Sequence, residues 1–316
     1  MTAAPDVAVH WELGSDRPRE DHGFFGPDSP TWKVWTSPTA LIGFQRSVVL
    51  EHFEPHLAAA VADAAGIYRD PRGRMDGTLA YFLIVATADS RTAVEASEHL
   101  QKVHARSKGL DPVTGTRYSA NDPASQLWIH VTGWHSVLKC YEVFGPGPLS
   151  RAEEDRYWSE CVIAAELQTV NPAEVPRSRD EVRQYFARMR PTLCTSERAQ
   201  RAMHYLLRTP RSGSSNMQFW AISRLLAPAT IATLPRWMRE LGQFDQPGIV
   251  DAAYRPLVSA GMRIAGIPAV ETTILRRSLP MTRTALRDFH RAKAPLRPVT
   301  VTPAEAKERY GRRATA

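Results

Sequence analysis

Two neighbouring stretches decide the fold of this chain: GRMDGTLAYFLIVATADSRTAVEASEHLQKVHARSKG (73–109) and ANDPASQLWIHVTGWHSVLKCYEVF (120–144). Apolar residues recur in both at the spacing of one helical face, which predicts amphipathic helices. Four polar side chains fall on the apolar side of these helices, those of Arg74, Thr78, His104 and His130. A guanidinium, a hydroxyl and two imidazoles directed at one apolar interior suggest a buried cofactor.

Helix start and stop signals extend the pattern along the chain. Asp122-Pro123 combines an N-cap with a proline at the first helical position. The segments 150–153 and 178–181 both fit the capping box. Pro55 should kink or divide the apolar run that begins at Thr39. Further helices are expected over about 196–208, 216–226, 230–242 and 248–266.

Signals for strands are few. The helix that holds His104 is expected to begin near Ser90 and to run to about Lys108, with Gly109 as its stop. VTVTP (299–303) is the only segment with strand-like alternation, and it is short. We therefore predict a single, all-α, multi-helix domain over 39–295. An extended arm docked by its aromatic residues is expected over 1–38, and a basic tail over 296–316.

Composition excludes several classes of protein. The chain has 316 residues, 43% of them hydrophobic, which is enough for a large core. No run approaches the roughly 18 consecutive apolar residues of a membrane-spanning helix. The N-terminus has neither a basic start nor an apolar h-region, so we expect a cytoplasmic protein. Cys140, Cys161 and Cys194 are too few and too scattered for a disulfide framework, and we expect small buried thiols.

The net charge is +7, and much of the excess lies after residue 270. Such a region can contact an anionic membrane surface, or it can be a solvated basic face, which is the simpler interpretation. The region lacks a helix-turn-helix pattern and lacks aromatic residues interleaved with the charges, so no nucleic-acid partner is expected.

The two inward histidines allow two interpretations each. Leu100 lies one turn before His104, which places the imidazole on the packed side of its helix. His130 shares its face with Trp134, whereas His135 lies off that face and is expected at the surface. A lone inward histidine is usually a hydrogen-bonded core residue, but neutral imidazole is also a common haem-iron ligand.

Arg74 and Thr78 are one helical turn apart. A buried arginine requires an anion, either an Asp or Glu side chain or a cofactor carboxylate such as a haem propionate. Thr78 could bond to the carbonyl of Arg74 or to a bound ligand. Motifs of other chemistries, namely GxSxG, GxxxxGK[ST], HExxH and the dinucleotide fingerprint, do not occur. A metal site on the i, i+4 pair His52 and His56 is disfavoured because Pro55 disturbs the helix between them.

The order of these segments resembles the MpaB / latex-clearing-protein (rubber oxygenase) family. The resemblance covers about residues 24–210 and is specific as an ensemble. It is carried by FFGPDSPTWKVW, GRMDGTLAYF, KVHARSKGLDPVTGTRYSANDP, LWIHV, YEVFGPGPLSRAEEDRYWSE and NPAEVPRSRDEVRQYF.

The resemblance implies an all-α fold loosely related to globin helix packing, with a buried haem b. It implies His104 as the iron ligand, Arg74 and Thr78 as the arginine and threonine of a GRxxxT motif, and His130 as a haem-pocket residue. It also implies an oxygenase that uses dioxygen on an apolar, isoprenoid- or lipid-like substrate, with cleavage of C=C bonds in the better-known members. A haem-free lipid- or isoprenoid-binding protein on the same scaffold is the alternative.

Two positions depart from the family pattern. Relatives commonly have a basic residue directly before the threonine, where this chain has Gly77. Glycine cannot supply a cation there, which is the sequence support for the haem-free alternative. Many relatives also read L-H-P where this chain has Phe53-Glu54-Pro55. Glu54 is therefore a candidate catalytic base or, preferably, a salt-bridge partner of Arg74.

Overall fold

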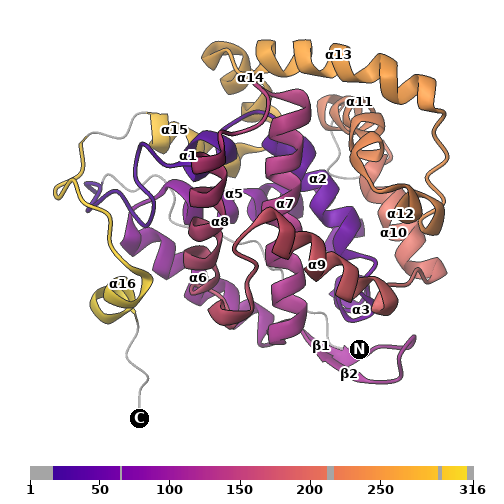
Figure 1. The fold of residues 1–316 in the computed structure, drawn as a ribbon, viewed down its shortest axis with the longest axis horizontal. Coiled ribbons are helices and arrows are strands. Elements are labelled where there is room, and N and C mark those ends of the chain that lie inside the picture. Colours follow the sequence, from indigo (N-terminus) through magenta and orange to yellow (C-terminus); the bar gives the residue numbers. More distant parts are fainter. Residues whose placement is uncertain (1–16, 65, 212–216, 291–293, 312–316) are drawn as a thin grey trace.

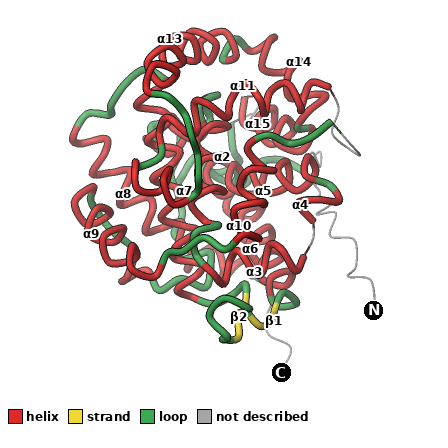
Figure 2. Tube along the Cα trace, turned by 90° about the vertical axis from the view of Figure 1, so that its right-hand side faces the viewer, coloured by secondary structure: helices red, strands yellow, loops and turns green. Residues whose placement is uncertain are grey.

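The structure is a computed structural model that describes residues 17–311 except 65, 212–216 and 291–293. The first part of the expected N-terminal arm and the end of the expected tail lie outside the described residues. Within them the chain is helical apart from one small hairpin, and the prediction of an all-α fold is confirmed (Figures 1 and 2).

The helices follow one another with short connections. Their bounds are α1 Pro30–Trp35, α2 Ala40–Glu51, α3 Pro55–Ala64, α4 Gly66–Arg69, α5 Pro71–Thr87, α6 Ser90–His104, α7 Pro123–Phe144, α8 Arg151–Ala165, α9 Arg179–Met189, α10 Glu197–Leu207, α11 Met217–Thr233, α12 Arg236–Leu241, α13 Gly248–Ala265, α14 Pro268–Ser278, α15 Pro280–His290 and α16 Pro303–Tyr310. Two single 3₁₀ turns cover Pro172–Glu174 and Arg190–Thr192. The strands are β1 Lys108–Leu110 and β2 Arg117–Ser119.

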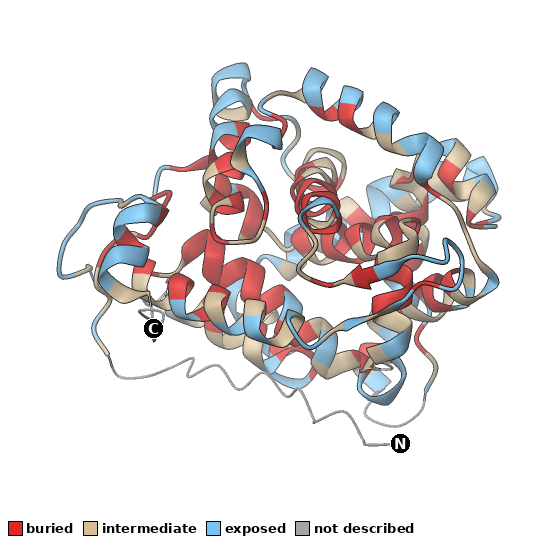
Figure 3. Ribbon diagram, turned by 90° about the horizontal axis from the view of Figure 1, so that it is seen from below, coloured by how far each residue is buried: buried red, intermediate tan, exposed pale blue. Residues whose placement is uncertain are grey.

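The core is centred on α2, α5 and α7, whose residues are mostly buried (Figure 3). The axes of α2 and α7 approach closely at Gly43, where a Cβ atom would lie 2.6 Å from Val137 Cα. Tryptophan rings fill the space around this contact, and Trp35 lies between Phe82 and Trp134 with ring centroids 5.4 and 5.6 Å away. Close helix contact and large rings together place the ends of α2, α5 and α6 around one interior region.

Capping residues begin the helices largely as predicted. Asp122 accepts hydrogen bonds from the first turn of α7, and Ser150 and Glu153 form the full capping box of α8. Ser178 caps α9, but the Glu181 carboxylate accepts from the Arg177 amide instead of completing the box. Pro55 begins α3 and so divides the apolar run. Residues 30–35, which we expected to be extended, form α1.

The prediction that α6 continues to Lys108 is wrong. The helix ends at His104, and residues 108–110 pair with 117–119 as an antiparallel hairpin. The connecting DPVTG is a side-chain-stabilised turn, in which the Asp111 carboxylate accepts from the amides of Val113 and Thr114, and Gly115 takes φ +69°. Local turn chemistry therefore overrides helix propagation. Residues 299–303, the one alternating segment, form no strand.

The far side of α5 is tied to α15. The buried Asp76 carboxylate accepts hydrogen bonds from the amides of Met281 and Thr282, each at 2.8 Å, at the start of that helix. Burial raises the pKa of Asp76. None of the described helices is both long enough and apolar enough to cross a bilayer.

Candidate functional site

The first turns of α5 carry Arg74 and Thr78. Asp70 caps the helix by accepting from the Gly73 amide at 2.9 Å, which places Arg74 at the end of the first turn. The Thr78 hydroxyl donates to the Arg74 carbonyl at 2.9 Å, one of the two partners expected for it. Arg74 and Thr78 therefore lie on one face of the helix.

This face of α5 borders open space. Gly77 is buried, yet a Cβ atom built on it would meet no other atom within 4 Å. Arg74 and Thr78 are exposed, although surrounding protein lowers the pKa of the Arg74 guanidinium by desolvation. We call this open space beside Arg74, Gly77 and Thr78 the α5 hollow.

Glu51, the last residue of α2, is the carboxyl group whose charge opposes the lowering of the pKa of Arg74 by burial. Its Oε1 accepts a 2.6 Å hydrogen bond from Ser47 Oγ. Burial raises the pKa of Glu51 to about 7, and the positive charge of Arg74 partly opposes this shift. Glu51 is therefore poised to gain or lose a proton near neutral pH.

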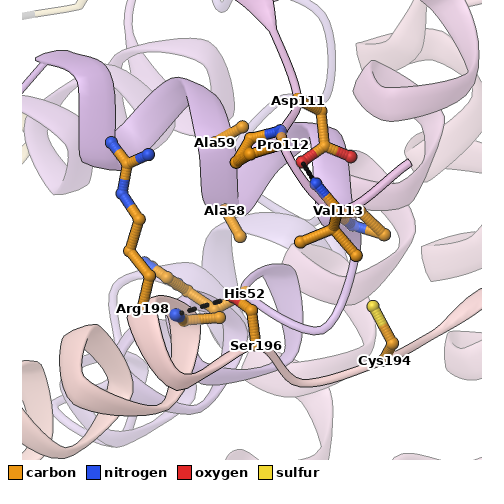
Figure 4. A pocket seen from close by; sticks show the side chains of 11 residues that line it. His52, Ala58, Ala59, Asp111, Pro112, Val113, Cys194, Ser196 and Arg198 are labelled. Carbon is orange, nitrogen blue, oxygen red and sulfur yellow. Dashed lines mark hydrogen bonds between the residues drawn. The ribbon is translucent and has the colours of Figure 1, made fainter. Parts of the chain in front are cut away.

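His52 follows directly as the C-cap of α2. Its Nδ1 donates to the Val48 carbonyl at 2.6 Å, and its buried Nε2 has no hydrogen-bond partner. Burial and Arg74 lower the pKa of His52 to about 4. The ring borders a small pocket of about 300 Å³ whose wall includes Asp111 and Cys194 (Figure 4).

His104 is the last residue of α6 and is half-buried. Burial, with a smaller effect from Arg74, lowers the pKa of His104 to about 4. Its Nδ1 lies 3.5 Å from Gln126 Nε2 on α7, and Asn121 also hydrogen-bonds to the ring. The imidazole is therefore neutral at physiological pH and is oriented by amide side chains.

These side chains form one cluster, made of Glu51, His52, Arg74 and His104 and hereafter called the Arg74 cluster. The electrostatic effect of Arg74 on the pKa of all three partners indicates that the end of α2, the start of α5 and the end of α6 lie near one another. Arg74, Thr78 and His104 were singled out from the sequence. Glu51 and His52 were not grouped with them, although both are polar residues at the end of an apolar helix.

The predicted salt bridge between Glu54 and Arg74 does not form. Glu54 accepts from the amides of His56 and Leu57 at the start of α3, and its Oε1 lies 3.9 Å from His56 Nδ1. Burial raises its pKa. Glu54 is held there because the chain turns at Pro55 and exposes the free amides of a new helix.

His130 is fully buried between α7 and α8. Its Nε2 donates to the Cys161 carbonyl at 2.8 Å, while its Nδ1 has no partner, and burial lowers its pKa to about 4. The ring lies 5.8 Å from Trp134. These contacts are those of a hydrogen-bonded core histidine, and they link it to α8 instead of to the Arg74 cluster.

His135, expected at the surface, is partly buried. Its Nδ1 lies 3.3 Å from the buried Arg46 Nη1, and its ring packs on Phe186 at 5.0 Å. Cys140 and Cys161 are buried free thiols, as expected, and Cys194 is partly buried. No group of three or more His, Cys, Asp or Glu side chains placed to hold a metal ion occurs in the described part of the chain.

An apolar cleft of about 460 Å³ lies on the other side of α5, where Leu79 and Leu83 point away from Arg74. Ala265 of α13 and Leu275 of α14 also line it. By helical geometry, Leu79 and Leu83 are on the face opposite Thr78 and Gly77, so α5 separates this cleft from the α5 hollow.

Comparison with known proteins identifies one family. Residues 32–266 match the model of the catalytic domain of the ER-bound oxygenase mpaB/B'/rubber oxygenase family, and this range includes every residue of the Arg74 cluster. No curated protein and no solved structure gives a significant match. The matched range covers most of the chain, and its helices carry the GRxxxT-type motif and His104 in the order expected. The chain therefore belongs to the ER-bound oxygenase mpaB/B'/rubber oxygenase catalytic-domain family.

Proposed function

We propose that this protein is a haem b-dependent oxygenase that acts on an apolar, isoprenoid- or lipid-like substrate with dioxygen, by oxidative cleavage of a C=C bond. The single observation that supports this most strongly is His104. A neutral imidazole, held by amide side chains at the end of α6, lies within the electrostatic reach of Arg74 beside open space.

The residues present fit a haem. Iron requires a deprotonated imidazole nitrogen, and His104 has its pKa lowered to about 4. A haem propionate requires a cation, and Arg74 has no ion pair with a carboxylate within 4 Å among the described residues. The missing side chain at Gly77 leaves room along α5. We assign His104 as the iron ligand and Arg74 as the propionate partner, with Thr78 at the rim.

Bound haem would supply the one-electron and dioxygen chemistry, which the protein's own side chains cannot provide. The protein residues would position the substrate and handle protons. We propose Glu51 for the proton-handling role first considered for Glu54, because its pKa of about 7 suits acid–base exchange and because Glu54 is engaged in capping α3. His130 would support this region from the core, by joining α7 to α8.

The walls near the cluster favour an apolar substrate. Val48, Leu100 and Ile129 lie one turn from Glu51, His104 and Gln126 on three different helices, and each is apolar and only partly buried. Pockets for apolar ligands combine such walls with few polar groups. An isoprenoid or lipid chain matches these walls better than a charged metabolite does.

The test is an absorption spectrum of the protein supplied with haemin, as isolated and after reduction. We expect a Soret band in the wild type, its loss in His104→Ala, and its partial recovery when free imidazole is added. His99→Ala, an exposed histidine on the same helix, is the matched control and should leave the spectrum unchanged. Arg74→Gln should weaken haem affinity by about tenfold, for one lost charge-assisted hydrogen bond.

Two results would overturn the proposal. A wild-type protein without a Soret band would contradict haem binding. An unchanged spectrum of His104→Ala would contradict the assignment of His104 as the iron ligand. The absence of the family's basic residue at position 77 favours one competing function, a haem-free lipid- or isoprenoid-binding protein. That alternative predicts a colourless protein that still binds a fluorescent fatty-acid probe in competition with an isoprenoid.

A further inference from the structure

Helix α13 presents an apolar face to solvent. Its large side chains at the outer surface are highly exposed, at 79% for Ile249, 59% for Leu257 and 57% for Ile264, and Ile267 just beyond the helix is 50% exposed. Val258, on the opposite side, is 4% exposed and packs against Ile42 and Phe144 in the core. The inner face of α13 therefore packs on the core, whereas the outer face contacts no other part of the described chain that would bury it.

The exposed residues form one continuous stripe. At 100° per residue, Ile249, Leu257 and Ile264 fall within one quarter of the helix circumference, and the exposed Ala253 and Ala260 lie between them. Ile267 follows directly after the C-cap of the helix. A soluble helix ordinarily carries charged or polar residues on this side. We call these six residues the α13 stripe. Helix α13 lies along one edge of the molecule, away from the β1–β2 hairpin (Figure 1).

The charge beside the stripe is positive. Arg263 is exposed and lies beside the stripe, about 40° around the helix from its edge, whereas Arg255 lies on the opposite side of the helix. Asp251 is the only acidic residue of α13, and it is held inward by Arg239 Nη1 at 2.7 Å and Gln246 Nε2 at 2.6 Å. The net charge of the whole chain is +7, which also favours an anionic partner.

We propose that the α13 stripe docks on the surface of an anionic lipid bilayer, with the apolar side chains entering the interface and Arg263 contacting a lipid phosphate. Basic amphipathic helices bind membranes in this way, lying in the interface plane. An arginine side chain on the flank can reach outward to the headgroups while its methylene stem covers apolar surface. This docking is independent of the haem proposed above.

A second copy of the chain is the less suitable occupant. A stable protein–protein interface buries about 800 Å² per partner, from roughly 20–30 residues a side, whereas the stripe has only six residues. Pairing of two such helices would also bring Arg263 of each copy to the interface, and α13 exposes no carboxylate to neutralise this charge. A lipid surface supplies both the apolar medium and the anions.

The experiment is flotation of the full-length protein with phosphatidylcholine vesicles that contain or lack phosphatidylserine. The wild type should float with the anionic vesicles, and the triple variant Ile249→Ser/Leu257→Ser/Ile264→Ser should partition at least about tenfold less. Arg263→Gln should lower partitioning by about fivefold, on the anionic vesicles only.

The matched control is Leu110→Ser/Val113→Ser. It removes two apolar side chains of similar exposure, 61% and 50%, from the hairpin at the far end of the molecule, and it should float like the wild type. All these positions are exposed, so thermal unfolding should be unchanged. Equal flotation of the triple variant, or no flotation of the wild type, would overturn the proposal.

Sedimentation velocity separates the remaining case. A dimer that the triple variant dissociates, together with no vesicle binding, would assign the stripe to a second copy and reject the lipid surface. The haemin spectrum should be the same in every α13 variant. A failure of the membrane proposal would therefore not contradict the oxygenase proposal, and a failure of the oxygenase proposal would not contradict the membrane proposal.

Discussion

At the scale of single residues, Glu51 gives a prediction that depends on pH. Burial raises its folded-state pKa to about 7 from an ordinary value near 4.5. Between these two values the folded protein holds a proton that the unfolded chain has released, so stability falls as pH rises from about 4.5 to 7. The loss should be about 2 kcal/mol, a figure reduced for the partial exposure of the side chain.

Glu51→Gln should remove this loss, because the amide does not ionise. Urea unfolding at pH 5 and pH 7.5 gives the change in the free energy of unfolding for each protein. Subtracting the change in the variant from that in the wild type isolates the contribution of Glu51, because the neighbouring histidines titrate in both. If both proteins lose the same stability over this interval, Glu51 is not the buried, proton-holding group that the structure indicates.

The sequence does not show where α2 ends, and this boundary distinguishes Glu51 from Glu54. Both are carboxylates near the end of the same apolar segment, and the sequence singled out the one that stands where relatives have histidine. Helix α2 ends at Glu51, and the chain then turns so that Glu54 caps α3. The helix boundary decides which carboxylate faces Arg74, and boundaries are set by tertiary packing as well as by local signals.

At the scale of the helices, two glycines predict opposite outcomes for the same substitution. Gly43→Ala would place a Cβ atom 2.6 Å from Val137 Cα, so α2 and α7 must separate, and we expect a loss of about 2–3 kcal/mol. Gly77→Ala meets nothing within 4 Å and sits inside α5, where alanine is the better helix former by about 1 kcal/mol.

Chemical unfolding of both variants at one pH measures the two effects. Gly77→Ala should gain about 0.5–1 kcal/mol, and it is the matched control for Gly43→Ala. A destabilised Gly77→Ala would show that the space beside α5 is filled, which would remove the α5 hollow on which the proposed haem site depends.

The hairpin after α6 illustrates how elements are misassigned. The segment from His104 to Gly109 fits the end of a helix, because polar and basic residues followed by glycine are typical of a C-terminus. The strands are three residues each, too short for alternation to be visible. The Asp111 turn, with Gly115 at φ +69°, is the local signal for the hairpin, and it prevails over the helical periodicity.

At the scale of the whole molecule, haem binding should stabilise the fold by mass action. Haemin at about 100 times its dissociation constant contributes about 2.7 kcal/mol to the folded state. For a domain of this length that corresponds to an increase in Tm of about 4 °C. His104→Ala should show a smaller increase or none, measured by thermal unfolding with and without haemin.

Metal-free protoporphyrin IX is the control ligand for this measurement. It presents the same apolar ring and propionates without an iron, so it should stabilise the wild type less than haemin does and should not distinguish wild type from His104→Ala. An equal shift for haemin in wild type and variant would contradict the role of His104, whatever the size of the shift.

The sequence by itself determined the all-helical architecture and most helix starts, because periodicity and caps are local properties of the chain. It also predicted Arg74, Thr78 and His104 as residues of one site, from the order of its motifs. Only the tertiary structure decided that Glu51 and His52 join Arg74, that Glu54 does not, that His130 is bonded to the α8 backbone, and that α13 leaves an apolar face uncovered. These depend on where helices end and on which faces meet. Such contacts form between residues far apart in the chain, and no local pattern records them.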